Sequence, residues 1–265
     1  MRFFWQLAIS YNMSTIVSIE FTFAFESALR NYVKTLLIIP AYNEEESLKT
    51  TIDVVLEKAP GVDFLIVNDG SSDGTERVCR ENHYPFLDLA TNLGLAGAFQ
   101  AGLKYAYRHD YDCAIQFDAD GQHLPEYITA LEHAIETYDI AIGSRFIGKK
   151  KPRSMRMFGS NLIQWSIKIT TGKTITDPTS GMRAFNKRMI AYMASGLNYG
   201  PEPDTVSYLI KRAGAKVVEV PVEMQDRQAG ESYLKPWSSA TYMMRMAISI
   251  LFLQFFRKKI GGDEK

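Results

Sequence analysis

Apolar runs alternate with amphipathic stretches along the first half of the chain. The runs are nearly continuous, as expected of strands that helices cover on both faces. They span residues 35–40, 64–67, 86–89, 113–117 and 140–144. Helical patterns lie between them, from residue 47 onward and at 76–81, 95–108 and 125–138. Strands that alternate with helices predict an α/β fold with a mostly parallel, doubly wound sheet.

The second half predicts a helix at 154–170, a helix at 205–213 and a last strand at 216–221. The first of these helices has an apolar stripe of Phe158, Leu162, Trp165 and Ile169. Its polar stripe contains Arg153, Arg156, Ser160, Gln164 and Lys168. Glu202 and Asp204 precede the second helix, either as caps or as residues that approach a site, and a cap is favoured for Asp204.

Polar residues follow each of the first four predicted strands. They are Tyr42, Asn43 and Glu44 after the first strand, Asp69 after the second, Asn92 after the third, and Asp118 and Asp120 after the fourth. In doubly wound sheets, ligands bind outside the carboxyl ends of the strands. The four loops therefore predict one binding site at one edge of the sheet.

Asp118 and Asp120 are the paired acids of that site. Alternate residues of an extended segment share a face, so the two carboxylates converge on one point. Two like charges held together need a cation, and Mg²⁺ or Mn²⁺ with oxygen ligands is the usual solution. Gln122 would add an oxygen and His123 a nitrogen. The alternative is an acidic turn that caps the helix beginning near Leu124.

Composition narrows the class of protein. The chain has 265 residues, 46% of them apolar, and no net charge, so no overall field favours nucleic acid as a partner. Cys79 and Cys113 have no metal-ligand spacing and suit a reducing compartment. Residues 1–33 form an N-terminal extension, which alternates from Val17 onward like a strand or an unstructured segment. It has no convincing cleavage site, so a signal peptide is not expected, and Met13 is an alternative start.

Three motifs carry a resemblance to a known family. Residues 40–44 read Pro-Ala-Tyr-Asn-Glu, residues 67–71 read Val-Asn-Asp-Gly-Ser, and residues 118–120 read Asp-Ala-Asp. In this order they resemble the inverting family 2 glycosyltransferases with the GT-A fold. Within that family the chain is most similar to the dolichol-phosphate-mannose synthase and bacterial polyprenyl-phosphate sugar transferase branch. The resemblance spans about residues 34–235, which we take as the catalytic domain.

The resemblance implies a nucleotide-sugar site and a metal on the diphosphate. The site would be lined by Pro40, Ala41, Tyr42, Asn43, Glu44, Val67, Asp69, Asn92, Asp118, Ala119, Asp120 and Arg227. The metal would be Mg²⁺ or Mn²⁺, held by Asp118, Asp120 and Gln122. Taken singly, Glu44 is also typical of a first helical turn, and Asp69 is typical of a turn. Arg227 lies in an Arg-x-x-Gly-x-Ser loop that would close over the diphosphate. This loop departs from the family, because Tyr233 stands where a Lys is common.

The resemblance also implies an acceptor site. Arg145, Arg156 and Ser160 would hold the phosphate of a polyprenyl phosphate, and Arg156 and Ser160 lie one turn apart on the predicted helix. A solvated surface face is the alternative. Asp177, in the Asp-Pro-Thr-Ser-Gly loop, would face the sugar and would be the base for a hydroxyl acceptor. For this loop the alternative is a turn capped by Asp177.

Residues 236–265 form an apolar segment flanked by cations and a tail. The apolar part is shorter than the ~20 residues that span a bilayer, and Arg245 interrupts it. An amphipathic helix on the membrane surface is the favoured interpretation. The alternative is packing on the domain itself or on a partner, either a small membrane protein or a second copy in a homo-oligomer.

The sequence thus predicts a metal-dependent inverting glycosyltransferase, peripheral to the cytoplasmic face of the membrane. It would move a sugar, with a UDP-sugar favoured, to a polyprenyl phosphate for surface polysaccharide or glycan modification. A family 2 enzyme that extends a saccharide, and a non-catalytic membrane adaptor with the same fold, are the alternatives. A sugar-phosphate nucleotidyltransferase is disfavoured, because Tyr42-Asn43-Glu44 replaces its Gly-rich loop and reactive Lys.

Overall fold

The computed structural model describes residues 33–252, apart from residues 153, 197–198 and 226–235. The chain divides into residues 1–33 and a larger unit, residues 34–265. The predicted N-terminal extension and the Arg227 loop therefore lie outside the described residues, save for Val33.

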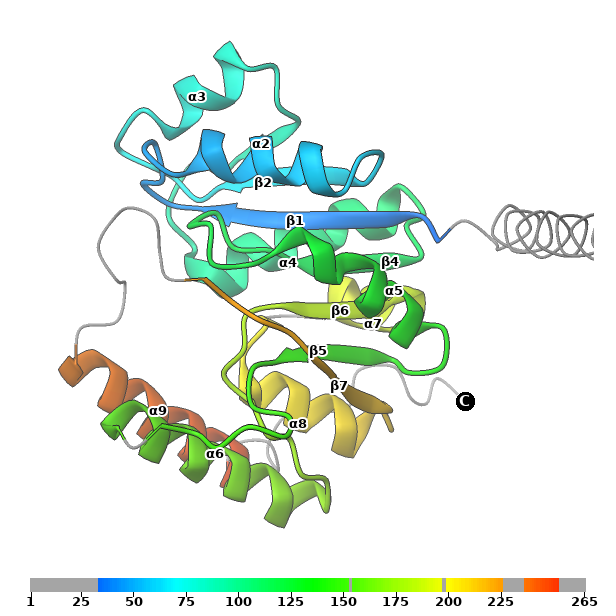
Figure 1. The fold of residues 1–265 in the computed structure, drawn as a ribbon, viewed down its shortest axis with the longest axis vertical. Helices are drawn as coiled ribbons and strands as arrows, with labels where there is room; N and C mark the ends of the chain where they lie inside the picture. The colour runs from blue at the N-terminus through cyan, green and yellow to red at the C-terminus, as the bar shows by residue number, and fades with distance from the viewer. Residues whose placement is uncertain (1–32, 153, 197–198, 226–235, 253–265) are drawn as a thin grey trace, which may run out of the picture. The chain divides into compact units, whose positions relative to one another are not determined.

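A seven-stranded sheet forms the centre of the larger unit (Figure 1). Its strands are β1 (Thr35–Ala41), β2 (Asp63–Asn68), β3 (Phe86–Asp88), β4 (Cys113–Gln116), β5 (Ile140–Ser144), β6 (Arg183–Asn186) and β7 (Val217–Pro221). They lie in the order β3-β2-β1-β4-β6-β5-β7. Only β6 runs antiparallel to its neighbours β4 and β5; the other pairings are parallel. The predicted α/β class and mostly parallel sheet are confirmed.

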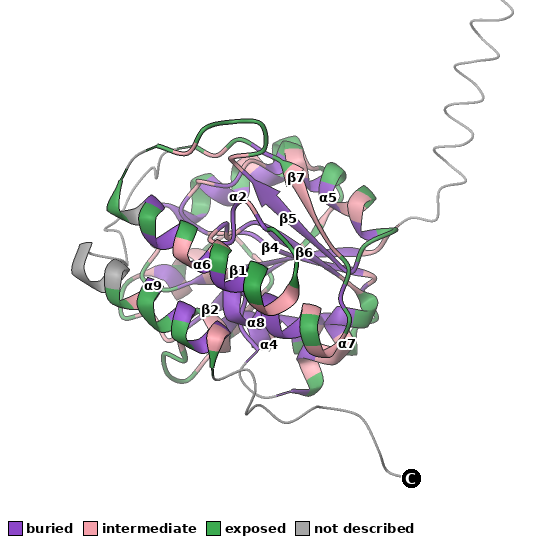
Figure 2. Ribbon diagram, turned by 90° about the horizontal axis from the view of Figure 1, so that it is seen from below, coloured by how far each residue is buried: buried purple, intermediate pink, exposed green. Residues whose placement is uncertain are grey.

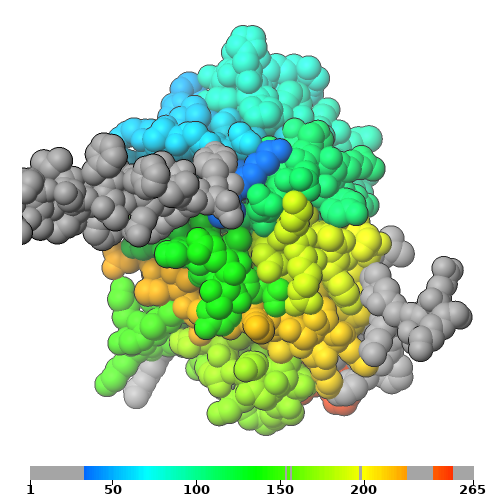
Figure 3. Space-filling view, turned by 90° about the vertical axis from the view of Figure 1, so that its right-hand side faces the viewer, coloured from blue at the N-terminus to red at the C-terminus, as the bar shows by residue number. Residues whose placement is uncertain are grey.

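Helices cover both faces of the sheet. They are α2 (Leu48–Lys58), α3 (Thr75–Glu81), α4 (Gly94–Arg108), the 3-10 helix η1 (Pro125–Tyr127), α5 (Ile128–Ile135), α6 (Met155–Thr171), α7 (Lys187–Ser195), α8 (Pro203–Arg212) and α9 (Pro236–Leu251). Figure 2 shows α2 and α5 on one side of the sheet and α4, α7 and α8 on the other. In the space-filling view, α2 and α3 (cyan) and α6 (yellow-green) lie at opposite ends of the surface (Figure 3).

Two elements were not predicted, β6 and the helix α7 that follows it. The strand has four residues and begins with the buried Arg183, so its sequence contains no apolar run that would predict a strand. It lies between β4 and β5, where it pairs Ile115 with Ala184 and Ile142 with Arg183. A buried Arg is unfavourable unless its guanidinium is hydrogen-bonded, so this strand requires hydrogen-bond acceptors near Arg183.

The described part of the C-terminal segment is a helix that packs on the domain. α9 buries Met243, Met246 and Ile250 against α6 and α8. A Cβ atom at Gly159 of α6 would lie 2.6 Å from Met243 Cγ, so the glycine permits this close approach. None of the helices among the described residues has the length and apolar character needed to traverse a bilayer.

Candidate active site

Asp69 joins the ends of β1 and β2 to the start of α4. Its backbone N–H donates to the Ala41 carbonyl over 2.9 Å, and its Oδ1 accepts from the Leu93 N–H over 2.7 Å. Burial raises the pKa of Asp69, against the opposing effect of the backbone N–H groups of Leu93 and Gly94. Gly70 adopts φ +65°, and a Cβ atom there would lie 2.7 Å from the backbone N of Asn92. The predicted loops of Asp69 and Asn92 are thus in contact.

The loop after β1 is tied to the loop after β2. The Asn43 N–H donates to Ser71 Oγ over 3.0 Å, and its Oδ1 accepts from the Ser72 N–H over 2.8 Å. The Glu44 N–H donates to Thr75 Oγ1 over 2.9 Å. A cavity of about 300 Å³ lies between these loops, lined by Asn43, Glu44, Glu45, Glu46, Ser47 and Asp73. These hydrogen bonds between the two loops hold this edge of the sheet in shape in the absence of a ligand.

The expected nucleotide-site residues differ in what they expose. Tyr42 is 38% exposed, Asn43 is exposed, and Glu44 is half-buried. By contrast, the side chains of Ala41, Val67 and Ala119 are buried. These three therefore have only backbone atoms to offer to a ligand at this edge. Two of their carbonyls are already hydrogen-bonded, since Ala41 accepts from Asp69 and Ala119 from Thr51 Oγ1.

His123 holds Asp118 through both of its ring nitrogens. The Asp118 N–H donates to His123 Nδ1 over 2.9 Å, and Nε2 lies 3.4 Å from Asp118 Oδ2. Because Nδ1 accepts, the proton of the neutral ring is on Nε2, facing the carboxylate. Gln116 Nε2 donates to Asp118 Oδ1 over 3.1 Å. In this arrangement both ring nitrogens of His123 face Asp118, so the histidine positions that carboxylate, and a metal-ligand role for His123 stays a prediction.

Asp120 lies in the same turn and is mostly buried. Its Oδ1 accepts from the Gln122 N–H over 3.0 Å, and Gly121 between them adopts φ +75°. Among the described residues, no group of three or more His, Cys, Asp or Glu is arranged to hold a metal. A site with two carboxylates and the Gln122 amide still fits Mg²⁺ or Mn²⁺, which take oxygen ligands and complete their shell with substrate phosphate.

The 177–181 loop presses on the acidic turn. A Cβ atom at Gly181 would lie 2.8 Å from Asp118 Oδ2 and 3.2 Å from His123 Cε1, so a larger residue does not fit. Arg183, at the start of β6, fixes this loop from inside the protein. Its Nε and Nη2 donate to the carbonyls of Ser180 and Pro178 over 2.9 and 2.6 Å, and Nη1 donates to that of Pro201.

Arg183 was missed by the sequence analysis. It is fully buried, and burial lowers its pKa while the nearby Tyr242, Glu202, Asp177 and Asp118 oppose the shift. The guanidinium therefore contributes positive charge beneath the acidic turn. The sequence signal that could have pointed to Arg183 is a charged residue between the apolar Met182 and Ala184.

Arg145 and Asp177 form a bidentate ion pair. Arg145 Nε and Nη2 lie 2.7 and 2.8 Å from the two oxygens of Asp177, which is fully buried. Glu219 of β7 accepts from the backbone N–H groups of Thr176 and Asp177 over 2.7 and 2.8 Å. The pair thus joins the end of β5 to the 177–181 loop, and both oxygens of the expected base are occupied.

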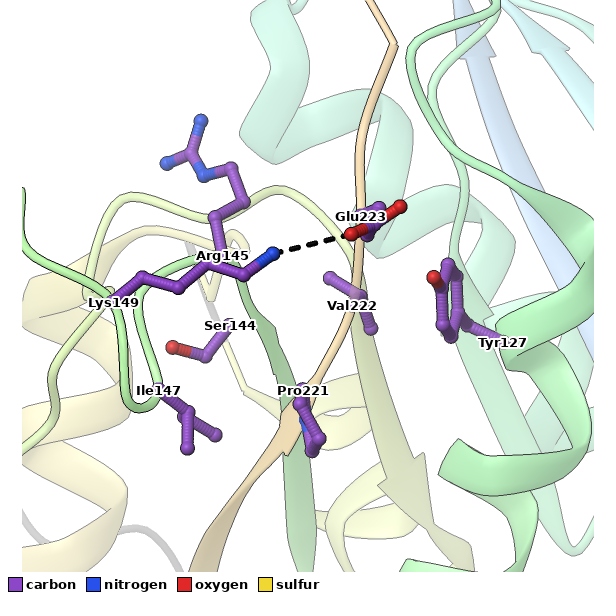
Figure 4. Close-up of a pocket in the computed structure, with 8 residues that line it drawn as sticks. All are labelled: Tyr127, Ser144, Arg145, Ile147, Lys149, Pro221, Val222 and Glu223. Carbon is purple, nitrogen blue, oxygen red and sulfur yellow. Dashed lines mark hydrogen bonds and ion pairs between the residues drawn. The ribbon is translucent and has the colours of Figure 1, made fainter.

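A second cavity, of about 200 Å³, lies beside Arg145 between the ends of β5 and β7 (Figure 4). Its lining includes Ser144, Arg145, Lys149 and Glu223, and Lys149 Nζ is 3.2 Å from Glu223 Oε1. The guanidinium of Arg145 points away from this ion pair. Of the acceptor residues predicted from sequence, Arg145 lines this cavity, and the lining includes neither Arg156, Ser160 nor the acidic turn.

Ser160, expected at the acceptor phosphate, is fully buried on α6. Its hydroxyl has no hydrogen-bond partner among the described residues. Arg156 lies one turn earlier on the same helix. A buried hydroxyl without a partner is unfavourable in the free protein and calls for water or ligand. A phosphate reaches it only if the residues that cover it move.

Comparisons with known proteins match this fold. The family model described as Glycosyl transferase family 2 matches residues 36–192. The chain belongs to glycosyl transferase family 2. It is therefore a glycosyltransferase, and the expected GT-A fold is confirmed.

Two relatives and one solved structure are similar to this chain. It is 34% identical to undecaprenyl-phosphate mannosyltransferase of Micrococcus luteus over 217 residues, which cover 76% of this chain and 87% of the relative. It is 29% identical to polyprenol monophosphomannose synthase of Mycolicibacterium smegmatis, over 83% and 88% of the two chains. Glucosyl-3-phosphoglycerate synthase of Mycobacterium tuberculosis, solved with Mn²⁺, uridine diphosphate and phosphoglyceric acid, has a TM-score of 0.65 at 16% identity. The match covers 86% of this chain and 80% of that one.

Proposed function

We propose that this glycosyltransferase moves a sugar from a nucleotide-diphosphate sugar to a polyprenyl phosphate at the cytoplasmic face of the membrane. The similarity to undecaprenyl-phosphate mannosyltransferase over 87% of its length carries the proposal. In this chain the loops of Asp69, Asp118 and Asp120 follow β2 and β4, the two strands that flank β1 in the sheet. Residues 34–235 would be the catalytic domain.

The donor would bind along the carboxyl edge of β1, β2 and β4. The loops of Asn43 and Asp69 would hold the nucleoside, and Asp118, Asp120 and Gln122 would hold Mg²⁺ or Mn²⁺ at the diphosphate. A bound divalent ion stabilises the negative charge that develops on a departing nucleotide. His123 and Gln116 would keep the Asp118 carboxylate oriented for this. Arg227 would add a cation at the same diphosphate.

The acceptor phosphate would attack the anomeric carbon in one step that inverts it. A phosphate monoester has its second pKa near ~6, so it is a competent nucleophile at neutral pH without a base. This agrees with the occupied oxygens of Asp177. Arg156 and Ser160 would hold the phosphate, and Arg145 would act mainly through the 177–181 loop.

A transfer assay tests the proposal. The purified protein is incubated with Mn²⁺, a polyprenyl phosphate and, in separate reactions, labelled UDP-glucose, UDP-GlcNAc or GDP-mannose. UDP-sugars remain the favoured donors, and the mannosyltransferase relatives make GDP-mannose an essential arm. Label that enters the organic phase, and fails to do so with Asp120→Asn, supports the proposal. Label found only in a soluble glycan would instead support the saccharide-extending alternative.

A further inference from the structure

Lys151, in the loop between β5 and α6, is held in place by neutral groups. Its Nζ donates to Asn161 Oδ1 and to Gln164 Oε1, over 3.0 Å in each case. Within the part of the chain that the structure describes, no carboxylate lies within 4.0 Å of this ammonium. By contrast, the nearby Lys149 is paired with Glu223 (Figure 4). Lys151 is half-buried, so its ammonium has lost part of its water without gaining a counter-charge.

The charged groups around Lys151 are already engaged with other partners. Arg145 lies over the same aromatic ring, since Arg145 Cζ and Lys151 Nζ are 5.2 and 5.7 Å from the ring centroid of Phe146. Asp177 is bound by Arg145, and Glu219 accepts from two backbone N–H groups. Burial lowers the pKa of Lys151 and Arg145 lowers it further, while Asp177 and Glu219 oppose the shift from a distance.

The two amides that hold Lys151 bring its ammonium to the part of α6 that carries Ser160. Asn161 is the next residue after Ser160, and Gln164 lies one turn further along the helix. The hydroxyl of Ser160 is covered by protein, whereas Lys151 is partly exposed. The predicted apolar stripe of α6 lies on the exposed side of the helix, where Phe158, Trp165 and Ile169 are each more than half exposed. A cation is thus fixed at the surface beside the residues expected at the acceptor.

We propose that Lys151 binds the acceptor phosphate, together with Arg156 and Ser160. This inference rests on the proposed function, which makes the acceptor a phosphate monoester. That group carries close to two negative charges at neutral pH, and Arg145 has its Nε and Nη2 committed to Asp177. An ammonium has three N–H donors. Two of those on Lys151 hold it to α6, and the third makes a charge-assisted hydrogen bond to the phosphate.

Binding of farnesyl phosphate, a soluble prenyl monophosphate, tests this role. Calorimetric titrations use the full chain in metal-free buffer, so that the acidic turn cannot hold phosphate through a cation. Lys151→Gln keeps an N–H donor but loses the charge, and it should weaken binding about tenfold. Lys151→Arg keeps the charge and should retain most of the affinity. The matched control, Lys150→Gln, removes the same charge from an exposed neighbour and should bind like the wild type.

The amides that hold Lys151 provide a second test. Asn161→Ala/Gln164→Ala leaves the cation in the protein but frees its side chain, so binding of farnesyl phosphate should weaken by only about threefold. Thermal denaturation of the same variants measures how far these contacts fasten the loop to α6. If Lys151→Gln lowers Tm and leaves the affinity for farnesyl phosphate unchanged, the lysine is a structural link and the inference is overturned.

Two further ligands identify what Lys151 binds. Farnesol lacks the phosphate, and it should bind to the wild type and to Lys151→Gln equally. Inorganic phosphate lacks the prenyl chain. If Lys151→Gln weakens binding of inorganic phosphate but not of farnesyl phosphate, the lysine holds free phosphate and the acceptor assignment is overturned. A wild type that binds no farnesyl phosphate would overturn it as well.

Transfer kinetics separate this inference from the proposed function. Lys151→Gln should raise KM for the polyprenyl phosphate about tenfold and leave KM for the nucleotide-sugar unchanged. A rise in KM for the donor alone would contradict the acceptor role. If the wild type transfers no sugar to a polyprenyl phosphate with any donor, the proposed function fails. The farnesyl phosphate titration still decides whether Lys151 binds a prenyl monophosphate.

Discussion

Arg145 and Asp177 meet in a bidentate ion pair, with two N–O distances of 2.7 and 2.8 Å, in which Asp177 is fully buried and Arg145 is partly exposed. The sequence analysis expected these residues to do different things, since Arg145 was assigned to the acceptor phosphate and Asp177 to the base. Their contact instead joins the end of β5 to the loop that carries Gly181. We therefore propose that both residues act on the reaction through the position of that loop.

The Asp177→Asn variant tests this view. Because Asp177 is fully buried and Arg145 is partly exposed, breaking the pair should lower the free energy of unfolding by less than the ~3 kcal/mol typical of a fully buried pair. With a phosphate acceptor, kcat should fall by less than the hundredfold or so that loss of a general base causes. Chemical denaturation and steady-state kinetics measure the two effects. A fall of more than about a thousandfold with unchanged stability would restore Asp177 as the base. Arg145→Lys, which keeps the charge but not the fork, should show a milder loss of stability.

Gly181→Ala should impair turnover without unfolding the protein. The added Cβ would meet Asp118 Oδ2 at 2.8 Å and must displace the carboxylate or the loop. A shift of about 1 Å at a reacting centre costs about 100-fold in rate. The matched control is Gly214→Ala, whose Cβ would meet nothing within 4 Å although φ is +62°. It should lose about 1 kcal/mol of stability and keep its activity. Full activity in Gly181→Ala would contradict the tight packing at Asp118.

Asp118→Asn should abolish the metal-dependent binding of nucleotide. In the wild type, uridine diphosphate with Mn²⁺ at about 100 times its Kd should stabilise the fold by about 2.7 kcal/mol. Without Mn²⁺, or with Asp118→Asn, the rise in Tm should disappear. Asp110→Asn, a carboxylate paired with Lys187 at the far end of the sheet, should respond like the wild type. An equal rise in Tm with and without Mn²⁺ would remove the metal from the donor site.

Asp139 should make the protein sensitive to acid. Burial alone would raise its pKa, but hydrogen bonds from Arg188, the Lys216 N–H and Asn186 outweigh it and hold the pKa at about 2. A carboxyl whose pKa is lowered by folding stabilises the protein above the pKa of the unfolded chain, near 3.8, and this is lost as pH falls toward 2. The Asp139→Asn variant should therefore be about 2 kcal/mol less stable than the wild type at pH 7.

That difference should shrink as the pH approaches 2, which denaturant titrations at several pH values would measure. Asp53→Asn breaks the exposed pair with Lys49 and should leave the free energy of unfolding nearly unchanged at every pH. A gap between Asp139→Asn and wild type that stays constant with pH would contradict the lowered pKa.

The strands were predictable where both faces are buried, and β6 was not. β1 and β4 are apolar runs whose residues are almost all fully buried, so pattern and structure agree. β6 is short, antiparallel and begins with Arg183, whose cost of burial is met by three carbonyls from other parts of the chain. Those partners come from folded loops, which no local pattern reveals.

The sequence pattern of α6 also could not predict which of its faces is buried. Its apolar stripe predicted two faces but did not decide which one is buried. The buried face contains Ser166, whose hydroxyl donates to the Leu162 carbonyl of the previous turn over 2.9 Å. A serine hydroxyl that donates to its own helix backbone keeps a hydrogen bond when it is buried, so burying this face carries little desolvation cost. The apolar stripe is therefore not required on the buried side. Likewise, the contact between Gly181 and Asp118 joins residues 63 positions apart, which sequence spacing does not predict.

Arg183 has one more consequence. A single guanidinium holds the carbonyls on either side of Thr179 and that of Pro201, just ahead of α8. Because Asp204 of α8 in turn accepts a hydrogen bond from Ser249 of α9, a short series of contacts connects α9 to the loop that packs against the carboxylate of Asp118. A tilt of α8 or α9 should therefore also change the position of the 177–181 loop beside Asp118.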